Sequence, residues 1–382
     1  MRIAMPCENL SLNSYLRVYP FAKFMAEKYD VTALGPIEKK GIYPPLRNDH
    51  SIKYKATTSR KIFPFYLKNT AEIYKNIDAD IIHAFKTTAY SFLPALLKKI
   101  KNKKQKLVVD INDWESQYVL DNFFSWNPID LAKFTLVDMY VPESYFIKKI
   151  IESQVKKADA VITSSRTLQR MFGGTWIPTG PNTNYFDPEK FSGKKIRDEF
   201  GLKDKTVVLF MGTPKKHKGV DELITAVNEL RKKNEAIHLL IVGADKENSY
   251  VQTLRKEEGI TIEGYRDHKE MPEFLAASDI VCIPQKNTKS ANAQLPIKTF
   301  ESMAMAKPVI TTDTTDMKEI FTNCGTVIAP DALDELAQAI QRYAEDKDLR
   351  REHGKIAREE CVKKYSWKIM KQKTEEVYES IK

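Results

Sequence analysis

The sequence predicts an α/β protein with two parallel sheets in tandem, one in each half of the chain. Short apolar runs of strand length alternate with stretches whose apolar residues recur every three or four positions. Strands that alternate with helices form parallel sheets covered by helices on both faces. In addition, 382 residues exceed one ordinary core and suit two domains.

The C-terminal half shows this alternation most clearly. Its apolar runs lack the strict alternation of a half-exposed strand, which is typical of strands buried on both faces. The predicted strands lie at 206–212, 238–243, 261–265, 280–285, 308–312 and 325–330, and predicted helices at 220–230, 271–277 and 299–305.

The N-terminal half repeats the pattern. Its predicted strands lie at 2–6, 30–35, 80–85, 106–111 and 159–165, with helices at 15–28 and 89–101 and a long aromatic, mostly helical segment at 114–151. We predict an N-terminal domain over 1–177 and a C-terminal domain over 178–365. A last helix begins at Ser366, a good N-cap residue, and carries a broad apolar face that must be buried.

The sequence gives no support for several classes of protein and site. No run of about 18 apolar residues predicts a transmembrane helix, and the start lacks the order of a signal peptide, so we expect a cytoplasmic protein. No pair or cluster of cysteines has metal-site spacing, so the four are expected to be reduced core thiols: Cys7, Cys282, Cys324 and Cys361. The string Asp78-Ala79-Asp80 precedes a strand, which indicates a strand-entry turn rather than a metal site.

The positive charge is concentrated in the N-terminal half. The net charge is +10, and residues 1–190 hold 28 Lys and Arg against 19 Asp and Glu. Either an acidic binding partner or a solubilising surface would explain this excess of positive charge. Lysines mix with bulky apolar residues at 59–68 and 96–106, and aromatic residues follow at 122–134. Two interpretations are open: peripheral contact with an anionic membrane, or core aromatic residues next to an ordinary solvated basic face. No nucleic-acid-binding module is found.

The strongest candidate site is the segment 211–226, MGTPKKHKGVDELITA. A predicted strand ends at Gly212, a loop rich in lysine follows, and a helix begins near Gly219. The amide groups at that helix start, together with Lys218, suit a diphosphate, and glycine permits close approach of the backbone to the anion.

A second candidate lies at 290–312, SANAQLPIKTFESMAMAKPVITT. A polar loop leads through Pro296 into a helix that carries Lys298 and Glu301. A carboxylate near the carboxyl end of a strand can accept hydrogen bonds from a ribose diol, and Lys298 can neutralise phosphate. An ordinary surface charge is the alternative for Glu301.

These two segments, in this order, resemble the donor half of the family 4 retaining glycosyltransferases, which have the GT-B fold. Further similar segments are 155–165, 176–191, 263–285 and the C-terminal 365–378. The resemblance implies two Rossmann-like domains that face each other across a cleft, with the last helix packed back onto the first domain. It also implies a nucleotide-sugar donor, linked to UDP or GDP, and no cofactor or metal.

The resemblance also assigns roles to residues of the donor site. Lys218 and Gly212 match the family's diphosphate-binding lysine and strand-end glycine, and Lys298 and Glu301 match the lysine and ribose-binding glutamate of a P-x-K-x-x-E variant. The chain departs at two positions. Thr213 stands where the family often has arginine, so Lys215 or Lys216 is expected to substitute. Ala293 stands at the first glutamate, so Asn292 or Gln294 is expected to contact the sugar.

In the acceptor half, His83 ends one predicted strand and Asp113 follows another. We predict that both line the acceptor pocket, with a buried core histidine as the alternative for His83. The resulting function is a retaining transfer of a sugar to a saccharide or lipid-linked acceptor in the synthesis of surface glycans or glycolipids. A nucleotide-sugar epimerase and a non-catalytic nucleotide-sugar-binding protein remain alternatives.

Overall fold

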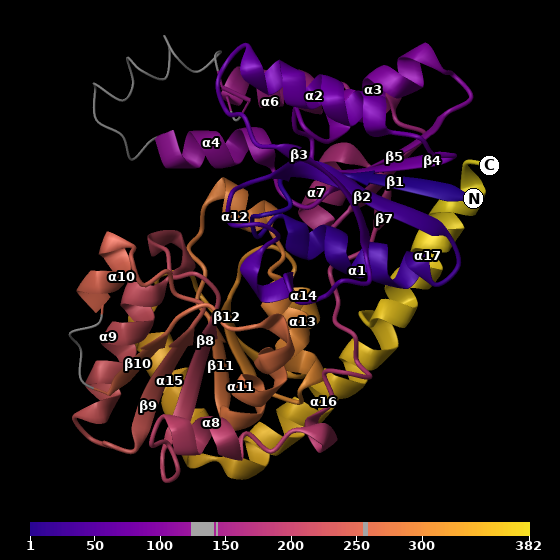
Figure 1. Cartoon of the computed structure of the whole chain (residues 1–382). Helices are drawn as coiled ribbons and strands as arrows, with labels where there is room; N and C mark the ends of the chain where they lie inside the picture. The colour runs from indigo at the N-terminus through magenta and orange to yellow at the C-terminus, as the bar shows by residue number, and fades with distance from the viewer. Residues whose placement is uncertain (124–140, 143, 255–258) are drawn as a thin grey trace. The chain divides into compact units, whose positions relative to one another are not determined.

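The protein is described here by a computed structural model, which covers residues 1–123, 141–142, 144–254 and 259–382 (Figure 1). Its contacts divide the chain into two compact units. Unit 1 comprises Met1–Thr179, Asn292–Gln294 and Lys368–Lys382, and unit 2 comprises Gly180–Ala291 and Leu295–Trp367. The three residues 292–294 therefore group with unit 1, whereas the sequence analysis placed them in the C-terminal domain. Within the described ranges, no helix has both the length and the apolar character needed to cross a membrane.

Unit 1 is built on a parallel sheet with the strand order β3-β2-β1-β4-β5-β6-β7. The strands are β1 (Arg2–Pro6), β2 (Asp30–Ile37), β3 (Lys53–Thr58), β4 (Ile81–Phe85), β5 (Lys106–Ile111), β6 (Ala160–Thr163) and β7 (Thr175–Trp176). The direction of the strand order reverses between β1 and β4. In open α/β sheets, ligands bind beyond the carboxyl ends of the strands at such a reversal.

Helices cover both faces of this sheet. They are α1 (Tyr15–Ala26), α2 (Phe65–Asn76), α3 (Phe92–Lys101), α4 (Glu115–Phe123), α6 (Tyr145–Glu152), α7 (Arg166–Phe172) and α17 (Trp367–Ser380). In Figure 1, α2, α3 and α6 lie along one face, and α1 and α17 along the other. The apolar side of α17 is buried at Met370, Val377 and Tyr378. The predicted segment 114–151 corresponds to α4 and α6, with residues 124–140 and 143 outside the described residues.

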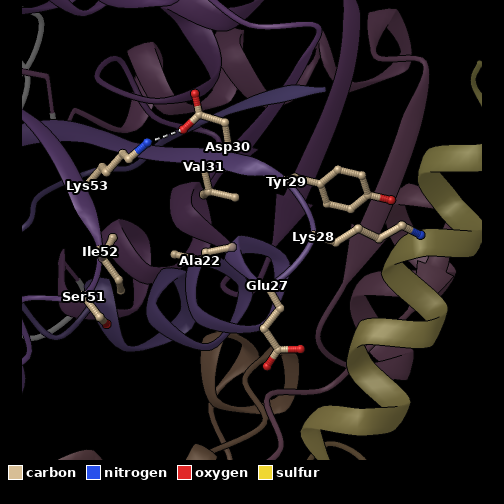
Figure 2. A pocket seen from close by; sticks show the side chains of 10 residues that line it. Ala22, Glu27, Lys28, Tyr29, Asp30, Val31, Ser51, Ile52 and Lys53 are labelled. Carbon is tan, nitrogen blue, oxygen red and sulfur yellow. Dashed lines mark hydrogen bonds and ion pairs between the residues drawn. The ribbon is translucent and has the colours of Figure 1, made fainter.

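A pocket of about 420 Å³ opens near the amino ends of β2 and β3 (Figure 2). Asp30 and Lys53 form an ion pair at its edge, with 2.6 Å between Oδ1 and Nζ. Ligands of parallel sheets bind at the opposite, carboxyl ends of the strands. This pocket therefore lies at the end of the sheet opposite to the one where such sheets bind ligands.

Unit 2 contains a second parallel sheet with the order β10-β9-β8-β11-β12-β13. The strands are β8 (Thr206–Met211), β9 (Ile237–Val242), β10 (Ile260–Glu263), β11 (Ile280–Ile283), β12 (Val309–Thr312) and β13 (Gly325–Ile328). The helices are α8 (Lys194–Glu199), α9 (Val220–Arg231), α10 (Ser249–Leu254), α11 (Met271–Ala277), α12 (Lys289–Ala293), α13 (Ile297–Ala304), α14 (Met317–Ile320), α15 (Leu333–Glu345) and α16 (Lys347–Lys364). The strand order reverses between β8 and β11.

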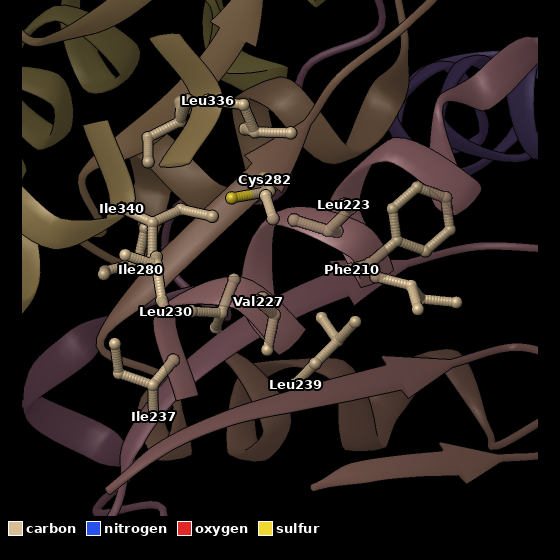
Figure 3. Close-up of a cluster of buried hydrophobic side chains, with 14 of the residues drawn as sticks. Phe210, Leu223, Val227, Leu230, Ile237, Leu239, Ile280, Cys282, Leu336 and Ile340 are labelled. Atoms are coloured by element: carbon tan, nitrogen blue, oxygen red, sulfur yellow. The ribbon is translucent and has the colours of Figure 1, made fainter. Parts of the chain in front are cut away.

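The core of unit 2 forms where α9 and α15 pack on the sheet (Figure 3). Leu223 and Val227 of α9 and Leu336 and Ile340 of α15 are buried against Phe210 and other strand residues. Such burial contributes about 1.5–3 kcal/mol for each large apolar side chain. This packing fixes the start of α9 beside the carboxyl end of β8, which is the position that the diphosphate prediction requires.

Candidate functional site

Two glycines shape the carboxyl end of the second sheet. Gly212 follows β8 with a φ of 110°, and Gly243 follows β9 with a φ of 98°. A Cβ atom on Gly243 would lie 3.2 Å from the Cα atom of Gly212. Positive φ and this close approach both favour glycine, so the backbone here is bare of side chains. The corner is therefore accessible to an anion at the β8–β11 reversal.

Two ammonium groups lie beside Gly212. Lys218 Nζ donates to the Thr213 carbonyl at 2.9 Å, and Lys298 Nζ donates to the Met211 carbonyl at 2.8 Å. A Cβ atom on Gly212 would lie 3.9 Å from Lys218 Nζ and 4.0 Å from Lys298 Nζ. Among the residues that the structure describes, neither ammonium group is within ion-pair distance of a carboxylate.

The electrostatics of this pair favour an incoming anion. Burial, and secondarily the charge of Lys215, lower the pKa of Lys218 to about 8. Burial, and secondarily Lys218, hold the pKa of Lys298 well below its usual value, although Glu301 opposes this shift. A diphosphate between the two groups would relieve both penalties, because an opposite charge stabilises the protonated form.

The start of α9 completes this corner. Gly219 adopts the left-handed conformation at a φ of 68°, and a Cβ atom there would lie 1.8 Å from the Pro284 carbonyl oxygen. The first turn contains Asp221 and Glu222, which bind Tyr250 and Lys286 respectively. The amino end of α9 therefore lies next to Lys218, and the positive end of the helix dipole adds to the attraction of an anion there.

Two other residues of the loop after β8, Thr213 and Lys216, were also predicted to belong to the donor site. Thr213 Oγ1 lies 3.4 Å from the hydroxyl of Tyr265, which follows β10. Thus a neutral hydroxyl pair occupies the place of the arginine expected from the family pattern. Lys216 is exposed. Its predicted contact with the donor stays a prediction.

Glu301 lies one turn beyond Lys298 on α13 and is buried, with 7% of its surface exposed. Its Oε1 atom lies 2.7 Å from Nε2 of His268. Burial lowers the pKa of His268, but the charge and hydrogen bond of Glu301 and the charge of Asp267 outweigh burial and raise it. His268, which no sequence pattern indicated, follows the end of β10 just as Lys218 follows the end of β8.

Asn292 and Gln294, predicted to contact the donor sugar, instead group with unit 1. Gln294 Nε2 donates to Asp113 Oδ1 at 2.8 Å, so a predicted donor residue binds a predicted acceptor residue. Between them, Ala293 is buried in the unit 1 core and its carbonyl accepts from Ser165 Oγ at 2.7 Å.

Asp113 also belongs to a charged cluster at the carboxyl end of the first sheet. Lys86, which follows β4, places Nζ 2.8 Å from Asp113, 2.6 Å from Glu115 and 3.2 Å from Glu8. Lys148 Nζ lies 2.8 Å from Glu115. Burial raises the pKa of Glu115, but Lys148 and Lys86 outweigh it and lower the pKa to about 2. This cluster, which the sequence analysis did not identify, holds Asp113 at the β1–β4 reversal.

His83 does not line a pocket, which corrects the prediction. Its side chain is fully buried, Nδ1 lies 2.8 Å from the Tyr378 hydroxyl, and the ring stacks on Phe85 at 4.3 Å. Burial lowers its pKa, against the opposing effect of Asp110. His83 is thus the buried core histidine, because its strand faces α17 inside unit 1.

Comparisons with known proteins agree with this architecture. Residues 192–360 match the family model described as glycosyl transferases group 1. The alpha-D-kanosaminyltransferase of Streptomyces kanamyceticus is 26% identical over 178 residues, which cover 45% of each chain. The GDP-mannose-dependent alpha-(1-6)-phosphatidylinositol monomannoside mannosyltransferase of Mycobacterium tuberculosis is 26% identical over 204 residues, covering 50% of this chain and 52% of that protein. The matches thus span about half the length of these relatives.

The fold extends over the whole chain. The crystal structure of Anabaena Alr3699/HepE in complex with UDP-glucose has a TM-score of 0.76 to this chain at 18% identity and covers 100% of both chains. At this identity the likeness concerns the fold. Residues 192–360 therefore resemble the group 1 glycosyl transferases, and the whole chain has the two-domain α/β fold of GT-B glycosyltransferases.

Proposed function

We propose that the protein transfers a sugar from a nucleoside-diphosphate sugar to an acceptor hydroxyl, with retention at the anomeric carbon. The observation that carries this proposal is the pair of ammonium groups, Lys218 and Lys298, beside the bare backbone of Gly212. Two cations without a carboxylate counter-ion among the described residues, next to a helix start, suit a diphosphate better than any neutral ligand.

The chemistry follows from where charge develops. As the bond from the sugar to the diphosphate breaks, negative charge grows on the leaving phosphate, and Lys218, Lys298 and the start of α9 stabilise it. The departing phosphate takes the proton of the acceptor hydroxyl, so no protein nucleophile is required. Positioning of the two substrates supplies much of the remaining rate.

The donor and acceptor are proposed by chemical class. UDP- and GDP-linked sugars are the candidate donors, since HepE was crystallised with UDP-glucose and the mycobacterial relative is GDP-mannose-dependent. A saccharide or lipid-linked acceptor is proposed because that relative is named for a phosphatidylinositol mannoside. Asp113 is the proposed acceptor-binding carboxylate.

We also propose that the reaction needs no metal or cofactor. Asp78 and Asp80 precede β4 and both contact Arg2, at 2.6 Å to its Nη1 and 2.7 Å to its backbone N, respectively. Turnover in excess EDTA should equal turnover without it. Loss of activity in EDTA that Mg²⁺ or Mn²⁺ restores would contradict metal independence.

A screen of UDP, GDP and ADP sugars for binding, followed by product analysis with the bound donor, tests the proposed function. Transfer of the labelled sugar to an acceptor supports it. Release of an altered nucleotide sugar would identify an epimerase instead. Binding without release of nucleotide from any donor would identify a non-catalytic binding protein.

Nucleotide binding is expected to weaken as the pH rises through about 8. The pKa of Lys218 in the folded protein is depressed to about 8, and a diphosphate binds its protonated form. The contribution of Lys218 to nucleotide affinity is thus complete below this pH and is lost above it. Kd should rise by up to about tenfold for each pH unit. Titrations of UDP or GDP across this range provide the measurement. The variant Lys218→Arg stays charged and should lack this component; an unchanged profile would contradict the assignment.

We propose that the face formed by α2 and α3 contacts the anionic inner surface of the cytoplasmic membrane. Ile62 and Phe65 are 64% and 61% exposed beside Lys61 and Lys68, and Ile100 of α3 is 56% exposed. Exposed apolar side chains among lysines suit the interface of an anionic bilayer. Of the aromatic segment 122–134 that the sequence adds, residues 124–134 lie outside the described residues. The four buried, unpaired cysteines agree with a reducing compartment.

Sedimentation with vesicles containing phosphatidylserine is expected to capture the protein at low salt and to release it at high salt. The double variant Ile62→Ser/Phe65→Ser should bind vesicles at least about tenfold more weakly. Each substitution removes an apolar side chain whose burial in the bilayer contributes roughly 1.5–3 kcal/mol. Val362→Ser is the matched control, because it also replaces an exposed apolar side chain with serine, at a 43% exposed position of α16. Equal capture of both variants would contradict this face as the contact.

A further inference from the structure

His268 and Glu301 form a half-enclosed pair next to the candidate diphosphate site. The side chains of His268 and Glu301 are 24% and 9% exposed, and 2.7 Å separates Nε2 from Oε1. Lys298, one helical turn from Glu301 on α13, contacts the Met211 carbonyl at the same sheet edge. The pair is therefore attached to the helix that supplies one of the two cations.

Two neighbours hold His268 in place: one at its backbone and one beside its imidazole. Asp267 caps the short 3₁₀ helix that begins at His268, and a reciprocal bond from the Asp267 backbone to Glu270 completes a capping box. The ring of Phe186 lies 5.5 Å from the imidazole. The capped backbone and the aromatic neighbour favour one position of the imidazole, from which Nε2 holds the Glu301 carboxylate.

The pairing leaves the two carboxylate oxygens unequal. Oε1 is bound to His268, whereas Oε2 receives no hydrogen bond from the residues described by the structure. A carboxylate oxygen accepts more than one hydrogen bond, and a vicinal diol supplies two donors. Oε2 is thus the acceptor that remains for a hydroxyl pair.

The pairing also affects the charge next to the candidate diphosphate site. An unpaired Glu301 carboxylate would repel a diphosphate bound by Lys218 and Lys298, because the Glu301 charge is close enough to shift the pKa of Lys298. Protonated His268 cancels that charge. The charged groups that act on His268 are Glu301 on α13 and Asp267 beside the imidazole, and Glu301 in turn acts on Lys298.

We propose that His268 is a positioning residue of the donor site: it holds Glu301 through Oε1, leaves Oε2 to accept from the ribose diol, and neutralises the carboxylate beside the diphosphate. This inference rests on the proposed function, because it requires a nucleotide at the Lys218–Lys298 corner. It adds a residue whose protonation governs donor affinity.

The test is the ratio of Kd values for UDP or GDP between His268→Gln and the wild type, measured as a function of pH. Glutamine keeps an N–H donor but carries no charge, and contributions from the lysines cancel in the ratio. The ratio is expected to be about tenfold at pH below the raised pKa of His268 and to approach one above it. In a Glu301→Gln background, His268→Gln should change Kd little at any pH.

Two further variants separate the possible outcomes. His268→Leu removes the donor as well, so its ratio should exceed one across the whole range, and circular dichroism confirms that it is folded. His50→Gln, an exposed histidine of unit 1, should leave the profile unchanged. A pH-independent ratio for His268→Gln, with a wild type that binds nucleotide, overturns the role of His268 alone. A wild type that binds neither UDP nor GDP overturns the proposed function itself.

Discussion

Lys218→Ala is expected to lower kcat by roughly 10²–10³ while the protein remains folded. Its ammonium group lies beside the bare backbone of Gly212 and the start of α9, where charge develops on the leaving phosphate. Removing one preorganised donor from an oxyanion-type site has about this effect. The loss should be greater in kcat than in donor KM, because the charge is larger in the transition state than in the bound donor.

Steady-state kinetics with the donor found in the screen provide the measurement, with the thermal midpoint as a check on folding. Lys233→Ala is the matched control, since Lys233 is exposed and lies beyond the opposite end of α9. It should leave kcat and KM unchanged. Turnover by Lys218→Ala within about twofold of the wild type would refute the assigned role.

Arg17→Met is expected to cost about 3–5 kcal/mol in the free energy of unfolding. Arg17 and Asp110 are 2% and 0% exposed, and the guanidinium binds both carboxylate oxygens, at 3.0 and 2.9 Å. Burial alone would raise the pKa of Asp110, but Arg17, supported by His83, lowers it. Without Arg17 the carboxylate is left uncompensated in the core of unit 1.

Urea unfolding of purified protein, followed by circular dichroism, measures this loss. Arg17→Met/Asp110→Leu removes both charges and should be more stable than Arg17→Met alone. Arg2→Met, which breaks an ion pair between half-exposed groups, should change stability little. A small effect of Arg17→Met, or additive effects of the two core substitutions, would contradict the buried ion pair.

The sequence predicts all six strands of the second sheet, including its edge strands β10 and β13, but misses the two edge strands of the first sheet, β3 and β7. β3 is largely exposed, and its sequence KYKATT contains no apolar run. β7 has only two residues. The long helix α16 escapes prediction because its buried residues are small, namely Gly354, Ala357 and Cys361, and leave no apolar stripe. Apolar periodicity detects only elements that bury large side chains.

The candidate site was predictable where it depends on a local rule. Lys218 and Gly212 follow from a strand that ends in glycine before a helix. His268 and Lys86 depend on partners far away in the sequence, Glu301 and Asp113, so no local pattern reveals them. The wrong placement of residues 292–294 has the same cause, because the chain leaves unit 2 for three residues and then returns.

A crystal structure of the protein with UDP or GDP tests the central claim most directly. The diphosphate is expected at the junction of β8 and α9, with its oxygens about 2.7–3.2 Å from Lys218 Nζ and from backbone N–H groups at the start of α9. A nucleotide bound elsewhere, or a corner at Gly212 closed by protein, would contradict the account.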